Sequence, residues 1–148
     1  MASLREKVEA ELEQMDRAIR ELPSVRRFPK LSVLELGGTA SLLSSLYHGV
    51  ENVLKQGLLE LGVAPPSGAA WHRDLLMSAC SQGIVSAELR DGLAPYLAFR
   101  HFFTHAYGFD LDAKRMRPLV GEARAVCASF KKEVRRFTRA QASRRRPQ

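Results

Sequence analysis

Apolar residues recur at steps of three and four along most of this chain, a spacing that predicts amphipathic helices. The pattern covers residues 2–22, 34–62, 71–80, 87–107 and a last segment that begins after Asp110 or Asp112. No segment alternates between apolar and polar residues over the length that a half-exposed strand requires. The pattern therefore predicts an all-α, up-and-down bundle of four to five helices joined by short loops.

Local signals mark several helix ends. Ser3 and Ser86 precede helical segments and are suited to cap them, and Gly108 predicts the end of the fourth segment. Residues 34–62 have the broadest apolar stripe, so we expect them to form the central, buried helix. Pro95 lies in the middle of the fourth segment, where a proline predicts a kink or a break.

Length and composition are typical of one globular domain, which we assign to residues 1–140. No apolar run approaches the roughly 20 residues that a membrane span needs. The N-terminal residues are charged throughout and do not resemble a signal peptide, so we expect a cytoplasmic protein without membrane contact.

The positive charge is concentrated at one end of the chain. Residues 130–148 hold eight basic side chains against a single acidic one, which accounts for the whole net charge of +7. We expect residues 141–148 to form a disordered basic tail. Such a tail suits a polyanion such as RNA, although a solvated terminus that only keeps the chain soluble explains the same composition equally well.

Four chemically active side chains lie close together between residues 100 and 107. They are Arg100, His101, His105 and Tyr107. Arginine binds phosphate as a planar fork, and histidine is the side chain best suited to move protons near neutral pH. His105 would deprotonate the 2′-hydroxyl of RNA or protonate the leaving 5′-oxygen, and Arg100 would stabilise the phosphoryl charge. The pattern indicates RNA cleavage that needs neither a metal nor a cofactor.

The spacing within this segment poses a geometric problem. Arg100 and His105 are five positions apart, so about 140° of rotation separates them on an ideal helix. Either the helix loosens near Gly108, or a second copy of the protein supplies the complementary group in a two-fold dimer. The alternative interpretation is that these side chains only cap carbonyls and line an interface.

The remaining histidines and their polar neighbours are further candidates for the site. His101 and His105 are four positions apart and could share a metal, but no third ligand occurs at a useful spacing. His48, Glu51 and Asn52 interrupt the apolar second helix. They either face the same cleft and support the residues that line it, or form a satisfied buried hydrogen-bond cluster, which is the interpretation we prefer. His72 is predicted to lie on the surface.

The spacing Arg100-x4-His105-x-Tyr107 follows a helix that contains Leu-Tyr-His-Gly-Val-Glu-Asn at residues 46–52. Together with the helix order, these motifs resemble the HEPN superfamily, and within it the HepT-like toxins of prokaryotic toxin–antitoxin pairs. The resemblance covers roughly residues 2–140. It departs from the family at His101, where Asn or Asp is common; a polar residue is kept, so we expect activity to survive.

The resemblance implies a dimerising bundle whose two copies build a composite ribonuclease site, with Arg100 and His105 as the catalytic pair. It also implies an antitoxin partner, a nucleotidyltransferase that silences the toxin by transferring AMP to Tyr107. The expected function is a metal-independent ribonuclease toxin of a type VII-like pair, in which Arg100→Ala and His105→Ala each abolish cleavage and leave the fold intact. The alternatives are a non-catalytic HEPN-type module that presents substrate or nucleotide to a nucleotidyltransferase, and a nucleic-acid-binding protein driven by its tail.

Overall fold

The computed structural model describes residues 2–105 and 110–145. These residues form six helices and no strand, which confirms the all-α prediction. The helices are α1 (Leu4–Glu21), the 3₁₀ helix η1 (Val25–Lys30), α2 (Val33–Glu60), α3 (Trp71–Ser81), α4 (Ala87–His105) and α5 (Ala113–Arg145). The sequence predicted the five α-helices and missed η1, which occupies the connector after the first helix.

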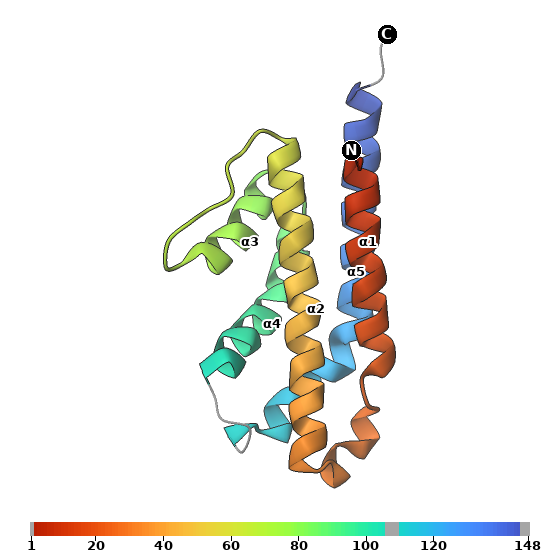
Figure 1. The fold of residues 1–148 in the computed structure, drawn as a ribbon, viewed down its shortest axis with the longest axis vertical. Coiled ribbons are helices and arrows are strands. Elements are labelled where there is room, and N and C mark those ends of the chain that lie inside the picture. Colours follow the sequence, from red (N-terminus) through yellow and green to blue (C-terminus); the bar gives the residue numbers. More distant parts are fainter. Residues whose placement is uncertain (1, 106–109, 146–148) are drawn as a thin grey trace.

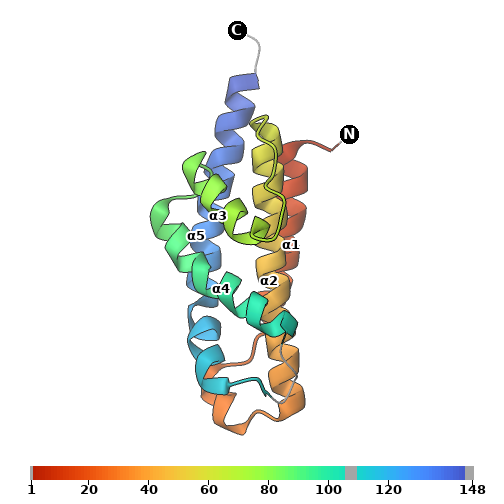
Figure 2. The ribbon, with the colours of Figure 1, turned by 90° about the vertical axis from the view of Figure 1, so that its left-hand side faces the viewer.

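Helix α2 is the centre of the bundle, as its apolar stripe predicted. It contacts each of the other four α-helices. Figures 1 and 2 show α1 and α5 running beside α2 along the long axis, while α3 and α4 cover another side of α2 and α4 crosses it obliquely. Most of the largest fully buried side chains come from four of these helices, among them Leu12, Tyr47, Leu54, Leu75 and Phe130.

Short polar side chains begin most of the helices. Ser3 and Ser86 each accept a hydrogen bond from the backbone N–H three residues on, at 3.1 and 3.0 Å. Ser32 and Glu35 form a reciprocal capping box at the start of α2. The side chain of Asp112, rather than that of Asp110, accepts a hydrogen bond from the backbone N–H of Lys114 in the first turn of α5. These contacts satisfy donors that the first turn of a helix otherwise leaves unpaired.

Pro95 does not break α4, which continues through it to His105. A proline removes only one backbone donor, and packing on both sides of it holds the helix in place. Tyr96 is buried and donates its hydroxyl to the carbonyl of Leu119 on α5 at 2.6 Å. The predicted capping residue Gly108 lies outside the described residues.

Helix α5 continues through residues 141–145, which we had expected to belong to a disordered tail. Apolar positions stop earlier, so the sequence pattern gave no reason to extend the helix. An ion pair at 2.6 Å between Arg145 and Glu60 of α2 links this last turn to the bundle. The assignment of residues 1–140 as the domain stays a prediction.

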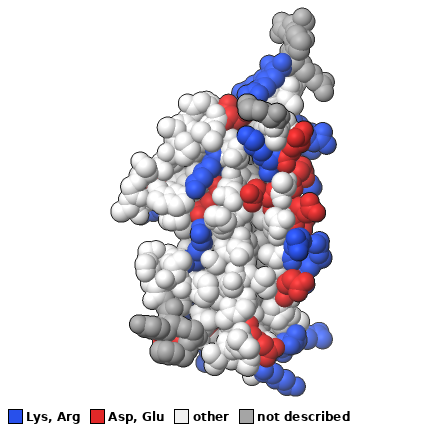
Figure 3. Space-filling view, viewed as in Figure 1, with Lys and Arg blue, Asp and Glu red and all other residues white. Residues whose placement is uncertain are grey.

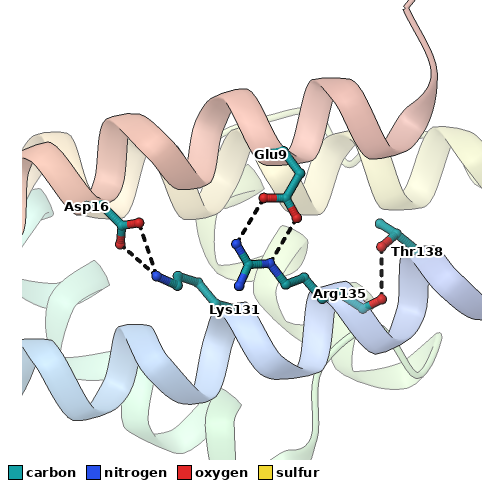
Figure 4. Close-up of polar contacts among 5 residues, drawn as sticks. All are labelled: Glu9, Asp16, Lys131, Arg135 and Thr138. Atoms are coloured by element: carbon teal, nitrogen blue, oxygen red, sulfur yellow. Dashed lines mark hydrogen bonds and ion pairs between the residues drawn. The ribbon is translucent and has the colours of Figure 1, made fainter.

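Ion pairs join the basic part of α5 to α1, as Figure 4 shows. Arg135 donates through Nε and Nη2 to the two carboxylate oxygens of Glu9, at 2.9 and 3.0 Å, and Lys131 donates to Asp16 at 2.9 and 3.0 Å. The hydrogen bond from Arg135 holds the pKa of Glu9 below its usual value. Both pairs are partly exposed, so each contributes at most about 1 kcal/mol to stability. Their main effect is to neutralise part of the basic segment.

Charged side chains are unevenly spread over the surface. Figure 3 shows basic and acidic side chains alternating along α1, whereas the side covered by α3 and α4 is mostly uncharged in that view. Within the described part of the chain, no helix combines the length and the apolar character that crossing a membrane requires.

Candidate ribonuclease site

A buried carboxylate, Glu51 on α2, organises the candidate site. Its side chain is only 1% exposed, and its two oxygens have different partners. Arg100 on α4 donates through Nη1 to Oε1, and His72 on α3 bonds through Nδ1 to Oε2 at 2.7 Å. One carboxylate therefore ties together three helices that are far apart in the sequence.

Glu51 can be buried because both of its carboxylate oxygens have a partner. A buried charge without a partner is costly, whereas a charge with an arginine and a second hydrogen-bond donor is tolerated. The Arg100 side chain is 20% exposed, so it reaches from Glu51 toward solvent. His48, one turn before Glu51 on α2, places its Nδ1 3.5 Å from Arg100 Nη2. Glu51 thus fixes the position of the motif arginine.

Tyr47 lies beside this ion pair and is fully buried. Its hydroxyl has no hydrogen-bond partner in the described part of the chain. Burial, followed by the nearby negative charge of Glu51, raises the pKa of Tyr47 well above its ordinary value. The phenol is therefore neutral, and its hydroxyl makes no hydrogen bond to the carboxylate that Arg100 holds.

A pocket with a volume of about 330 Å³ opens next to the ion pair, between the start of α3 and the last turns of α4. The side chains with chemical potential that line it are Trp71, His72, Arg100, His101 and His105. His101 and His105 are exposed, and their ring centroids are 5.0 Å apart. The pocket thus combines one anchored cation with three imidazoles, a set able to bind a phosphate and move protons.

The pocket shows how Arg100 and His105 can act together although about 140° of helical rotation separates them. Arg100 and His105 both line it within a single copy of the chain, although α4 stays helical as far as His105. His101 and Thr104 lie on the side of α4 that faces the pocket, and Arg100 and His105 flank them on either side. Both side chains can therefore reach the pocket from a regular helix, and no loosening before His105 is needed. Tyr107, the third residue of the motif, lies outside the described residues.

Glu51 and Asn52, two of the polar residues of α2 that the sequence singled out, face different neighbours. Glu51 is buried and hydrogen-bonded, but its partners are Arg100 and His72. The cluster of His48, Glu51 and Asn52 that we preferred from the sequence does not form, because His48 is exposed and neither it nor Asn52 bonds to Glu51 in the described residues. Asn52 is directed away from the site, because its Nδ2 donates to Glu11 Oε1 on α1 at 3.2 Å. Adjacent positions on a helix point about 100° apart, so one residue faces α4 and the next faces α1.

His72 is the site residue that the sequence did not reveal. We predicted it to lie on the surface, but it is half-buried, bonded to Glu51 and stacked on the ring of Trp71 at a centroid distance of 3.5 Å. Its partner is separated from it by a long loop, so no periodicity connects them. The only available signal was the buried acidic position on α2, which needs more than one donor.

The histidines of the pocket do not make a metal site with any other described residue. Within residues 2–105 and 110–145, no group of three or more histidine, cysteine, aspartate or glutamate side chains is arranged to hold a metal ion. His101 and His105 approach each other, as their spacing predicted, but together with His72, the third imidazole of the pocket, they do not form such a group in the described residues.

The all-α bundle is consistent with the fold of the HEPN superfamily. A family model described as HepT-like protein matches residues 38–141, so the chain belongs to the HepT-like family, a HEPN-type family of toxins and ribonucleases. The match begins inside α2 and leaves α1 and η1 outside it. No curated protein and no solved structure matches the chain.

Proposed function

We propose that this protein is a metal-independent endoribonuclease that acts as the toxin of a toxin–antitoxin pair. One observation carries the proposal: Arg100, held by the buried Glu51, lines the same pocket as His105. An arginine fixed in this way is suited to hold a phosphodiester, and an exposed histidine beside it is suited to transfer a proton. Membership of the HepT-like family agrees with this chemistry.

In the proposed reaction, the 2′-hydroxyl of RNA loses its proton to an imidazole and its oxygen attacks the adjacent phosphorus. The bond from phosphorus to the 5′-oxygen breaks, and that oxygen takes up a proton. Arg100 stabilises the charge that builds on the non-bridging oxygens. The products are a 2′,3′-cyclic phosphate and a 5′-hydroxyl, so the attacking group comes from the substrate.

The proposal includes a homodimer whose two copies complete the site. His101 and His105 are exposed at the rim of the pocket, on the last turns of α4. A two-fold axis near this helix would bring each motif close to its counterpart and enclose the RNA between two rims. Arg100 and His105 remain the catalytic pair, and His101 and Tyr107 serve to bind or orient the phosphate.

Cleavage of a mixed RNA pool by the purified protein in excess EDTA tests the proposal. We expect cleavage with cyclic phosphate ends, because the reaction uses only side chains and the 2′-hydroxyl. A matched oligonucleotide with one 2′-deoxy residue should resist cleavage at that position alone. A folded, unmodified protein that leaves RNA intact would instead support the non-catalytic module, which should also be harmless when expressed by itself.

The second part of the proposal concerns regulation by an antitoxin. A nucleotidyltransferase partner would transfer AMP to Tyr107, two residues beyond His105. A bulky phosphate ester there would occupy the site and offset the charge of Arg100. We expect the AMP-modified protein to lose RNA cleavage. Loss of the phosphate-orienting hydroxyl should slow the Tyr107→Phe variant, but the transferase should not lower its remaining cleavage further. A modified protein that still cleaves RNA at the unmodified rate would contradict this part alone.

A further inference from the structure

We propose that His72 is the general base of the RNA-cleaving site and that His105 is its general acid. This inference rests on the proposed ribonuclease function and assigns a second proton-transfer group to the same pocket. It starts from the contact between His72 and Glu51, which lies outside the Arg-x4-His-x-Tyr motif.

The contact with Glu51 determines which nitrogen of His72 is free to react. Nδ1 lies 2.7 Å from Glu51 Oε2, and the other carboxylate oxygen is paired with Arg100. A carboxylate accepts hydrogen bonds and has no proton to give, so Nδ1 carries the proton. Nε2 then holds a lone pair. Since the side chain is 38% exposed and lines the pocket, this lone pair is available to a bound hydroxyl.

The ring of His72 is also fixed in orientation. Trp71 stacks on it with ring centroids 3.5 Å apart and planes inclined by 29°. Lys55 on α2 places its Nζ 4.2 Å from the centroid of the Trp71 ring, which holds the indole in turn. A base held at one edge by a carboxylate and on one face by an indole is preorganised for proton transfer.

The other histidines fit the role of base less well. His101 and His105 are exposed on α4, and the structure gives neither of them a carboxylate partner in the described residues. His48 faces Arg100 through its Nδ1. Within the described part of the chain, His72 is the one imidazole of the pocket that has a carboxylate partner, and this partner fixes its tautomer and orientation, as in other carboxylate–histidine pairs.

The complete step then uses two histidines. Nε2 of His72 takes the proton of the 2′-hydroxyl as the oxygen bonds to phosphorus. The bond to the 5′-oxygen breaks, and a protonated His105 gives its proton to that oxygen. Arg100 holds the phosphate throughout. His72 ends protonated and His105 neutral, and proton exchange with water restores both before the next cycle.

The His72→Asn variant separates catalysis from support of Glu51. The asparagine Nδ2 occupies nearly the position of histidine Nδ1 and can still donate to Glu51, whereas nothing replaces Nε2. We expect cleavage to fall by about 10²-fold or more, with an unchanged melting temperature. Asp74→Asn, an exposed change on the same helix, should cleave like the wild type. Wild-type activity in His72→Asn would show that His72 only supports Glu51 and would overturn the inference.

A substrate with sulfur in place of the bridging 5′-oxygen assigns the two roles. A thiolate leaves without being protonated, so this substrate needs the base and not the acid. We expect His105→Ala to cleave it nearly as fast as the wild type, while His72→Asn stays about 10²-fold slower or worse. Recovery of His72→Asn instead would overturn the assignment. A wild-type protein that cleaves no RNA would refute the ribonuclease function itself, whereas an active wild type with an equally active His72→Asn refutes only this inference.

Discussion

Replacing Arg100 with alanine is expected to destabilise the protein by about 3 kcal/mol or more, in addition to abolishing RNA cleavage. The reason is that the change removes the cation from a carboxylate, Glu51, that is 1% exposed. Only His72 would then remain as its partner among the described residues. Urea unfolding monitored by circular dichroism would measure the loss. From the sequence alone we had expected this variant to keep its fold, and the buried partner of Arg100 revises that expectation.

A double-mutant cycle separates the effect of Arg100 on stability from its effect on RNA cleavage. Glu51→Gln alone should cost less, because Arg100 is partly exposed and can extend into water. In the double variant Glu51→Gln/Arg100→Ala no buried charge is left, so we expect it to regain at least about 1 kcal/mol relative to the sum of the two single changes. The double variant should nevertheless stay inactive. Strictly additive losses of stability would contradict the ion pair as the cause.

Replacing His105 with alanine should slow RNA cleavage but leave the stability of the protein almost unchanged. The side chain is exposed in the last turn of α4, so the free energy of unfolding should change by no more than about 0.5 kcal/mol. Loss of a proton-transfer group should slow RNA cleavage by about 10²- to 10⁴-fold. Initial rates on one labelled RNA, beside an unfolding curve, would measure both quantities.

The His105→Ala preparation also serves as the control for contaminating nucleases, because it is expressed and purified identically to the wild type. Equal cleavage by the two preparations would show either contamination or a dispensable histidine, and purification over a second column separates these cases. Cleavage that stays with the wild type and disappears from the variant would assign the activity to this chain.

Much of the fold could be predicted from the sequence because its determinants are local. The three- and four-residue periodicity located all five α-helices, and the broad stripe of residues 34–62 identified the central one. Capping by Ser3 and Ser86 was equally predictable, since the serine oxygen and the backbone N–H that donates to it are three residues apart. The sequence missed η1 because a short, basic connector carries no apolar period.

The site could be predicted only in part. Arg100 and His105 share one helix, so their motif is visible as a spacing. The contacts of Glu51 with Arg100 and His72 join residues that are 49 and 21 positions apart, and tertiary packing alone decides such contacts. Asn52 could not be placed from the sequence either, because the sequence does not tell whether Glu51 or Asn52 faces α4. The extension of α5 to Arg145 similarly depends on a distant partner, Glu60.

The shared carboxylate of Glu51 has a consequence for how this family can diverge. A lineage that no longer needs cleavage gains nothing by losing Arg100 first, because the remaining carboxylate would weaken the fold. Positions 51, 72 and 100 are therefore expected to change together, toward neutral or apolar residues, while exposed His105 drifts independently. Covariation of these three positions among relatives would show that the ion pair is kept or lost as a whole. Relatives that keep Glu51 and Arg100 but lack His105 would represent recent losses of activity.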